Sequence, residues 1–323
     1  MPSKTWGRFP TCRLHKQGSA LLTVLWLTAA LSAIGLAVAN NVRGETERSA
    51  TNVDDAKSYF IAKGAVERAM LHMFWGPDFY RPGQPTLDFS FPEAQAHVEI
   101  IPEASKLGLN SSPPEELVRL LTALGQPEDR AFEITAAIVD WRTPELTPGQ
   151  SPFDSFYLAQ SPSFLPRHSS FLENEELLQM KGVTPDLYYG TSLDGSRAGL
   201  RDCLSAYSGG GALDINTARA ESMIAIGISP GDAAAIVQNR ATHPILDYQE
   251  LGSIQQQLGL PGARLRIGGG SMFTIRATAR IRLQDGKLSD LRRSVAALVK
   301  YWYPNNTVGK TPGFEVVRWY DRT

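Results

Sequence analysis

The feature that most constrains this chain is an uncharged, mostly apolar run over residues 17–42, directly after a short basic leader. Residues 20–39 alone are long enough to cross a bilayer, since about 20 helical residues span roughly 30 Å. The leader carries four cations and no acid: Lys4, Arg8, Arg13 and Lys16. Because segments rich in Lys and Arg stay cytoplasmic, the sequence predicts a single-pass anchor with a cytoplasmic N-terminus and a translocated body.

The body that follows the leader is mildly acidic. The whole chain has a formal net charge of −1, and removing the leader's 4 positive charges leaves −5. Such a body is a poor electrostatic partner for nucleic acid, whose phosphates attract cations. The two cysteines are Cys12 in the leader and Cys203 in the body. If the leader is removed, no intramolecular disulfide can form, so the fold does not depend on one.

Three explanations fit the N-terminus: a cleaved secretory signal, an uncleaved anchor, or a leader cut just after Gly18. The small residues Ala37, Val38 and Ala39 suit a signal cleavage site, but the apolar run exceeds the usual 7–15 residues of a signal core. Residues 43–75 contain no proline, and apolar side chains recur there at helical spacing, at Tyr59, Ala62, Val66, Met70 and Met73. One long helix, apolar first and amphipathic afterwards, is therefore predicted, which favours the third explanation.

The rest of the chain changes character twice. Residues 76–92 are rich in Pro and Gly and predict a loop, and residues 94–101 alternate as a strand does. Residues 105–267 show short helical patterns separated by Pro and Gly. Residues 273–283 then alternate strictly, the Asp285-Gly286 pair predicts a hairpin turn, and residues 295–301 and 314–320 predict further strands. The pattern indicates an α+β fold in which a helical region interrupts a sheet.

Two helix starts are predicted inside the helical region. Ser112 and Glu115 have the spacing of a capping box, and Pro113 suits a first helical turn. Asn216 or Thr217 is expected to cap a second helix. Further short helices are expected over residues 171–182 and 248–254.

The segment from Gly227 to Gly231 matches the G-x-S-x-G pattern of a hydrolase nucleophile. That mechanism requires a backbone N–H after the serine, and Pro230 has none. The favoured interpretation is a turn between helices with Ser229 as N-cap. The same turn suggests a helix-hairpin-helix, so a membrane-anchored DNA-binding receptor is the alternative function. Asp232 in the first turn would repel phosphate, and Arg240 is the nearest cation downstream.

The whole arrangement resembles a type IV pilin-like protein, and within that class the K-type minor pseudopilins of type II secretion systems. The matching segments are G-S-A-L-L-T-V-L-W at 18–26, L-G-L-N at 107–110, I-V-D-W-R at 138–142, E-E-L-L-Q-M-K-G at 175–182 and D-I-N-T-A at 214–218. Most pilin-like proteins carry Glu at the fifth mature position, where this chain has Thr23. The K-type branch typically lacks that glutamate.

The resemblance implies a fold and a domain order. The fold is a pilin-like long N-terminal helix on a small antiparallel sheet, with a large all-α insertion of SAM-like or helix-hairpin-helix-like type. The expected parts are a prepilin leader (1–18), the transmembrane half of the helix (19–42), the amphipathic helix, loop and first strand (43–104), the inserted helical domain (105–267) and the C-terminal strands (268–323).

The resemblance also implies a role. Prepilin peptidase would cut between Gly18 and Ser19, and the new N-terminus would be methylated. The protein would sit in the inner membrane with a periplasmic body, at the tip of a pseudopilus that supports export of folded proteins. Its partners would be the I- and J-type minor pseudopilins and the inner-membrane secretion machinery. No catalytic site is found, and the function expected is structural rather than enzymatic, with no nucleic acid bound.

The D-W-R segment has a structural and a functional interpretation. In the structural one Trp141 is buried, and Asp140 and Arg142 are paired or capping. In the functional one the segment opens a calcium loop, as in some relatives, with Asp140, Glu145 and Asp154 as the candidate ligands. Three carboxylates are few for a cation that takes 6–8 oxygens. The five histidines are scattered and make no metal-binding spacing.

Overall fold

A computed structural model describes residues 17–76, 78–144, 151–190, 197–259, 264–283, 285–302 and 313–321. The chain divides into two compact units, Met1–Ala56 and Lys57–Thr323. Helix α1 (Gln17–Trp75) belongs to both units and ends at Trp75, as the sequence predicts.

In the first unit, the described residues belong to α1, and their apolar side chains are exposed from Leu21 to Val42. By length and composition α1 is the one helix in the described part of the chain that could cross a membrane. The absence of charge over more than 20 residues accounts for this, since helix formation satisfies the backbone hydrogen bonds that lipid cannot.

In the second unit, a five-stranded antiparallel sheet has the order β1-β2-β7-β8-β9. Its strands are β1 (Thr86–Phe91), β2 (Ala94–Pro102), β7 (Met272–Ile281), β8 (Arg293–Trp302) and β9 (Gly313–Tyr320). One face packs on α1: the predicted stripe is confirmed, with Ala62, Val66 and Met73 buried against alternate residues of the strands. The alternating pattern of β7 places Phe273, Ile275, Ala277 and Ala279 in this core.

Strand β1 corrects the prediction of a loop over residues 76–92. Leu87 and Phe89 are buried in the sheet core, and Phe91 packs against it. The strand is only 6 residues long and contributes three alternating apolar residues. The surrounding prolines and glycines therefore dominated the pattern and predicted a loop.

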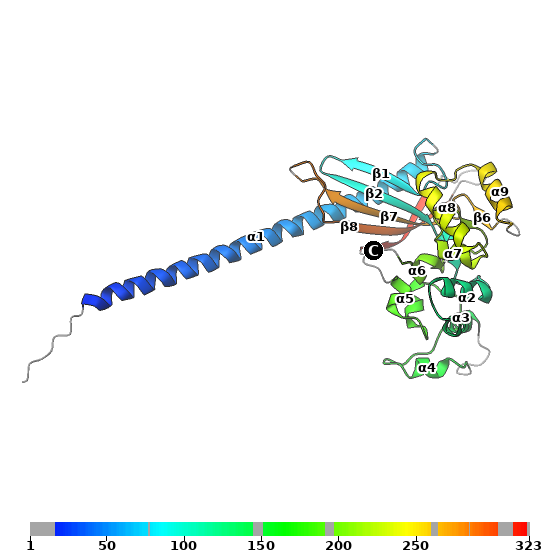
Figure 1. Cartoon of the computed structure of the whole chain (residues 1–323), viewed down its shortest axis with the longest axis horizontal. Coiled ribbons are helices and arrows are strands. Elements are labelled where there is room, and N and C mark those ends of the chain that lie inside the picture. Colours follow the sequence, from blue (N-terminus) through cyan, green and yellow to red (C-terminus); the bar gives the residue numbers. More distant parts are fainter. Residues whose placement is uncertain are drawn as a thin grey trace, which may run out of the picture. The chain divides into compact units, whose positions relative to one another are not determined.

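Between β2 and β7, residues 103–271 form an inserted helical region (Figure 1). Its helices are η1 (Glu103–Ser105), α2 (Pro114–Ala123), α3 (Glu128–Arg142), α4 (Asp154–Leu158), η2 (Asn174–Gln179), α5 (Pro185–Tyr189), α6 (Leu200–Cys203), α7 (Ala220–Ala225), α8 (Pro230–Thr242) and α9 (Tyr248–Gln257). Two short parallel pairs, β3 (Leu107–Gly108) with β4 (Leu204–Ser205) and β5 (Leu213–Asp214) with β6 (Leu265–Arg266), tie distant parts together. The region has its own core, running from Leu107 to Ile267 and separate from the sheet core.

Of the predicted helix caps in this region, those at Ser112 and at Asn216 or Thr217 are wrong. Helix α2 has Pro113 as N-cap and no side-chain capping bond, because Pro114 disfavours helical geometry at the residue before it. Helix α7 begins after Arg219. Asn216 instead bonds both backbone groups of Ile245, and the Thr217 hydroxyl donates to the Asp214 carboxylate.

Candidate functional site

The N-terminal end of α1 carries the residues expected at a processing site. Gly18 and Ser19 lie in the helical backbone near its start. The Thr23 hydroxyl donates to the Ala20 carbonyl at 2.9 Å, three residues back along the helix. A threonine whose hydroxyl is satisfied by its own helix is compatible with an apolar environment, and it brings no charge.

In the second unit, the face of α1 turned away from the sheet is exposed and carries large apolar side chains around the exposed Glu67. Phe60, Leu71, Phe74 and Trp75 are all exposed, and Phe60 is 68% accessible. At 100° per residue these four side chains share one side of the helix, opposite the buried Ala62 and Met73. Large apolar side chains gathered in this way mark a surface that contacts another molecule. The helical periodicity that predicts the buried stripe also places these four residues together on the opposite side.

The D-W-R segment ends helix α3, and the structural interpretation of its last two residues is confirmed. Trp141 is buried, and its indole N–H donates to Glu176 at 3.0 Å. Arg142 donates to the carbonyls of Leu109 at 2.8 Å and Ser112 at 2.7 Å. Burial lowers the pKa of the Arg142 guanidinium. Arg142 therefore ties the end of α3 to the segment before α2.

Two of the three candidate calcium ligands approach a common histidine. His168 Nε2 lies 3.3 Å from Asp154 Oδ1, and His168 Nδ1 lies 3.9 Å from Asp140 Oδ2. The Ser151 hydroxyl donates to Asp140 at 2.7 Å. Glu145 lies outside the described residues. Among the described residues, no group of three or more His, Cys, Asp or Glu side chains is arranged to hold a metal ion.

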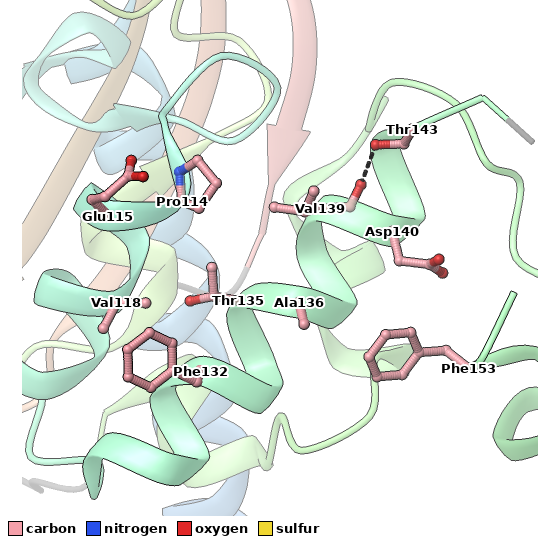
Figure 2. Close-up of a pocket in the computed structure, with 10 residues that line it drawn as sticks. All are labelled: Pro114, Glu115, Val118, Phe132, Thr135, Ala136, Val139, Asp140, Thr143 and Phe153. Atoms are coloured by element: carbon pink, nitrogen blue, oxygen red, sulfur yellow. Dashed lines mark hydrogen bonds between the residues drawn. The ribbon is translucent and has the colours of Figure 1, made fainter.

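Beside Asp140, an apolar groove of about 670 Å³ runs between α2 and α3 (Figure 2). Val118, Phe132 and Val139 line it, and Thr143 closes one end with a 2.6 Å hydrogen bond to the Val139 carbonyl. The buried Thr135 hydroxyl in its wall has no hydrogen-bond partner among the described residues. The groove offers apolar surface beside the acidic pair formed by Asp140 and Asp154.

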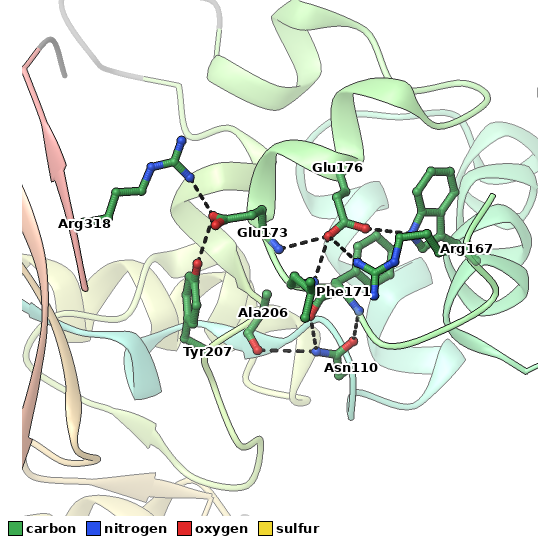
Figure 3. Close-up of polar contacts among 10 residues, drawn as sticks. Asn110, Arg167, Phe171, Glu173, Glu176, Ala206, Tyr207 and Arg318 are labelled. Atoms are coloured by element: carbon green, nitrogen blue, oxygen red, sulfur yellow. Dashed lines mark hydrogen bonds and ion pairs between the residues drawn. The ribbon is translucent and has the colours of Figure 1, made fainter. Parts of the chain in front are cut away.

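A polar network joins strand β9 to the inserted helical region (Figure 3). Arg318 Nη1 lies 2.7 Å from Glu173 Oε2, which also accepts the Tyr207 hydroxyl at 2.9 Å. Burial and this bond to Glu173 raise the pKa of Tyr207. Glu176, three residues further on, accepts the Trp141 indole and two backbone N–H groups. Sequence reasoning missed this network, because its directly bonded partners lie up to 145 positions apart.

Comparison with known proteins identifies the inserted region. Residues 103–190 match the family described as Type II secretion system (T2SS), protein K. Over 201 residues the chain is 26% identical to Type II secretion system protein K of Klebsiella pneumoniae, which covers 54% of this chain and 60% of that relative. This chain is therefore similar to type II secretion system protein K, over residues 103–190 in the family match and over 201 residues in the relative.

A solved structure has a fold similar to that of this chain. It is a chain in the crystal structure of the GspK-GspI-GspJ complex from the enterotoxigenic Escherichia coli Type 2 Secretion System, with a TM-score of 0.50 at 15% identity. The match covers 83% of this chain and 97% of that chain. The α+β architecture predicted from the sequence, a long helix with an antiparallel sheet and a helical region, is confirmed.

The turn that suggested DNA binding has a structural role here. Ser229 caps α8 by accepting the Asp232 N–H at 3.1 Å, and it donates its hydroxyl to the Asp232 carboxylate at 2.7 Å. Arg240 donates to the Ile215 carbonyl at 2.5 Å. Burial lowers the pKa of Arg240 to about 10. The helix N-terminus is thus occupied by a carboxylate, and the nearby cation is engaged elsewhere, so nothing supports the DNA-binding alternative.

Proposed function

We propose that this chain is a structural minor pseudopilin at the tip of a type II secretion pseudopilus, where it supports export of folded proteins across the outer membrane, and that it is not an enzyme. The observation that carries the proposal is the protein K match over residues 103–190, inserted between adjacent strands of a sheet that packs on a long helix. The curated relative is matched over 60% of its length, so the role of that whole protein enters as part of this proposal.

Thr23 supports an end position in the filament. In pilin assemblies the glutamate at this position faces the N-terminal amine of a neighbouring subunit, and an unpaired charge in an apolar helix bundle is expensive. Thr23 supplies no charge, and its hydroxyl is bonded within its own helix. A subunit that cannot neutralise a neighbour's N-terminal amine fits the end of the filament, where no neighbouring amine needs a partner. A Thr23→Glu variant that still caps the filament normally would show that the missing charge has no role.

The proposed partners are the I- and J-type minor pseudopilins. A related chain is found in a complex with GspI and GspJ, and α1 here presents Phe60, Leu71 and Trp75 on an exposed face. We expect a partner helix to cover this face. Bacterial two-hybrid assays with the I- and J-type proteins should lose signal for Phe60→Asp and Leu71→Asp. Tyr248→Asp, an exposed aromatic on α9, is the matched control and should keep the signal.

A deletion of residues 105–267 separates the contribution of the inserted region from that of α1. If the deleted chain still binds both partners, the contacts come from the helix alone. Intact binding by both α1 variants would contradict the proposed helical interface.

The proposed processing is a cut by prepilin peptidase between Gly18 and Ser19, followed by methylation, with the body in the periplasm. The basic leader, the uncharged segment and the helix that continues beyond it support this. Mass spectrometry of the mature protein should find Ser19 at the N-terminus. An N-terminal Asn40 would indicate a secreted protein, and Met1 would indicate a plain anchor.

Calcium binding by Asp140, Glu145 and Asp154 remains a proposal. Support comes from Asp140 and Asp154, whose carboxylates approach one imidazole, and from the Asp140 Oδ2 atom, which is buried with no hydrogen-bond partner among the described residues. Calorimetric titration with Ca²⁺ should show binding that Asp154→Asn removes. Asp129→Asn, in the exposed first turn of α3, is the control. An unchanged titration in Asp154→Asn would place any calcium site elsewhere.

A further inference from the structure

A polar cleft lies where the inserted helical region meets the sheet, on the sheet face opposite α1. Two adjacent cavities of about 250 and 210 Å³ share Lys106, Arg201, Thr274 and Arg276 in their walls. Thr274 and Arg276 belong to the outward face of β7, since Ile275 and Ala277 between them are buried against α1. Lys106 and Arg201 come from the inserted region. We call this space the seam cleft.

The walls of the seam cleft carry an excess of positive charge. The larger cavity is lined by five cations, Lys106, Arg201, Arg219, Arg240 and Arg276. Only two carboxylates among its described lining residues oppose them, Glu99 and Asp202. A third, Glu103, lies beside the cleft and pairs with Lys106 at 3.3 Å. Glu175 lines the smaller cavity, so four carboxylates face the five cations and a surplus of one positive charge remains.

Two of the guanidinium groups keep a buried donor without an acceptor. The Nε atoms of Arg201 and Arg276 are both buried and have no hydrogen-bond partner in the described part of the chain. The carboxylate neighbours do not satisfy them: Glu99 lies 3.4 Å from a terminal nitrogen of Arg276, and Asp202 lies 4.0 Å from Arg201 Nε. A buried donor on a charged group that lacks an acceptor is costly, so an oxygen-bearing anion would relieve it.

Arg201 is also held in place by an aromatic residue in the wall of the smaller cavity. Its guanidinium lies over the Tyr189 ring, 5.2 Å from the centroid. A stacked guanidinium keeps its N–H edge free and oriented, which is the geometry in which arginine recognises phosphate and carboxylate. Arg276 is fixed by its position in the middle of β7, opposite Ala296 of β8.

We propose that the seam cleft binds a compact oxyanion of the phosphate class between Arg201 and Arg276. A phosphate group suits the site better than a single carboxylate, because it carries up to two charges and presents oxygens in several directions to cations on opposite walls. One wall belongs to the sheet and the other to the inserted region. Binding would therefore fasten the two parts together, and it would stabilise the folded chain by mass action.

The test uses the full-length chain in detergent micelles. Equilibrium dialysis with radiolabelled inorganic phosphate should show saturable binding of one phosphate per chain, and saturating phosphate should raise Tm by about 3 °C relative to chloride at equal ionic strength. Arg276→Gln and Arg201→Gln should each weaken binding at least tenfold. Arg282→Gln is the matched control, because Arg282 lies just beyond β7 on the same exposed face, lines neither cavity, and its guanidinium donates to the Gly286 carbonyl.

The second arm identifies the source of the phosphate group. Micelles doped with phosphatidylglycerol present the same chemistry as a lipid headgroup, and a Tm rise there that both variants lose would support the proposal with a lipid source. Malonate provides the carboxylate comparison and should bind more weakly than phosphate. Three results would overturn the proposed phosphate site. They are no binding in either phosphate arm, malonate binding as tight as phosphate binding, and unchanged phosphate binding by a folded Arg201→Gln variant. None of these outcomes bears on assembly with other pseudopilins.

Discussion

Replacing Arg142 with alanine tests whether the D-W-R segment acts as a structural clamp. The guanidinium donates to the carbonyls of Leu109 and Ser112 at 2.8 and 2.7 Å. Both acceptor residues are buried, with Leu109 at 0% and Ser112 at 4% exposure. Arg142→Ala would leave the two carbonyls without their charged donor inside the core of the inserted region.

The size of the effect follows from those two bonds. A hydrogen bond to a charged group contributes about 1.5–3 kcal/mol. Burial lowers the pKa of Arg142, which shows that the guanidinium itself is partly desolvated, so the lower end of that range applies. Two bonds at the lower end sum to about 3 kcal/mol, which corresponds to a Tm lower by about 6–12 °C for a domain of this size.

Thermal unfolding of the full-length chain in detergent, followed by tryptophan fluorescence, measures this difference. Arg142→Lys should recover about half the loss, because one ammonium cannot reach two carbonyls as the planar guanidinium does. Arg130→Ala is the matched control: it removes one exposed bond from the same helix, to the Gly182 carbonyl at 3.0 Å. If Arg142→Ala unfolds within about 2 °C of Arg130→Ala, the clamp contributes no stability and the reasoning is refuted.

Three further predictions concern contacts inside the second unit. Trp141→Phe keeps the aromatic packing but loses the indole hydrogen bond to a carboxylate at 3.0 Å. The free energy of unfolding should therefore fall by about 1.5–3 kcal/mol. Glu173→Gln removes an ion pair with Arg318 in which both side chains are 43% exposed. The free energy of unfolding measured by chemical denaturation should therefore change by under about 1 kcal/mol. Burial raises the pKa of Cys203 to about 12, so in a Cys12→Ser background a thiol reagent at pH 8 should react only after unfolding; rapid labelling of the native chain would contradict this.

The sequence predicted the frame of the fold because its signals are local. A helix that crosses lipid and then packs on a sheet has an uncharged apolar segment followed directly by an amphipathic one, and both are visible in one continuous stretch of sequence. The strict alternation of β7 and the Asp285-Gly286 turn are likewise written in neighbouring residues: Gly286 adopts a positive φ of 82°, and its N–H donates to the Leu283 carbonyl at 2.9 Å. Strand β1 was not predicted, because three alternating apolar residues are a weaker signal than the prolines that flank them.

The caps failed for a different reason. Ser112 has the right spacing for a capping box, but its carbonyl is bonded by Arg142, 30 positions later. Asn216 is engaged by Ile245, 29 positions later. At Asn216 the non-local partner takes the side-chain amide, whereas at Ser112 the local prolines make Pro113 the N-cap. The position of His168 between Asp140 and Asp154 is also a non-local contact, and the spacing of histidines in the sequence does not predict it.

The inserted helical region leaves the sheet and returns to it at the ends of two neighbouring strands. Strands β2 and β7 are neighbours, and Pro102, where β2 ends, pairs with Phe273 at the start of β7. The insertion therefore leaves and re-enters the sheet at one point, as a hairpin loop would, and loop-closure entropy grows only slowly with its length. Because the region buries its own core, the sheet keeps its pairing without it, and the sequence period changes where the chain leaves the sheet. Contacts such as Glu103 with Thr274 and Glu173 with Arg318 then orient the region on the sheet. Orientation is thus set by a few polar side chains, which local patterns do not predict.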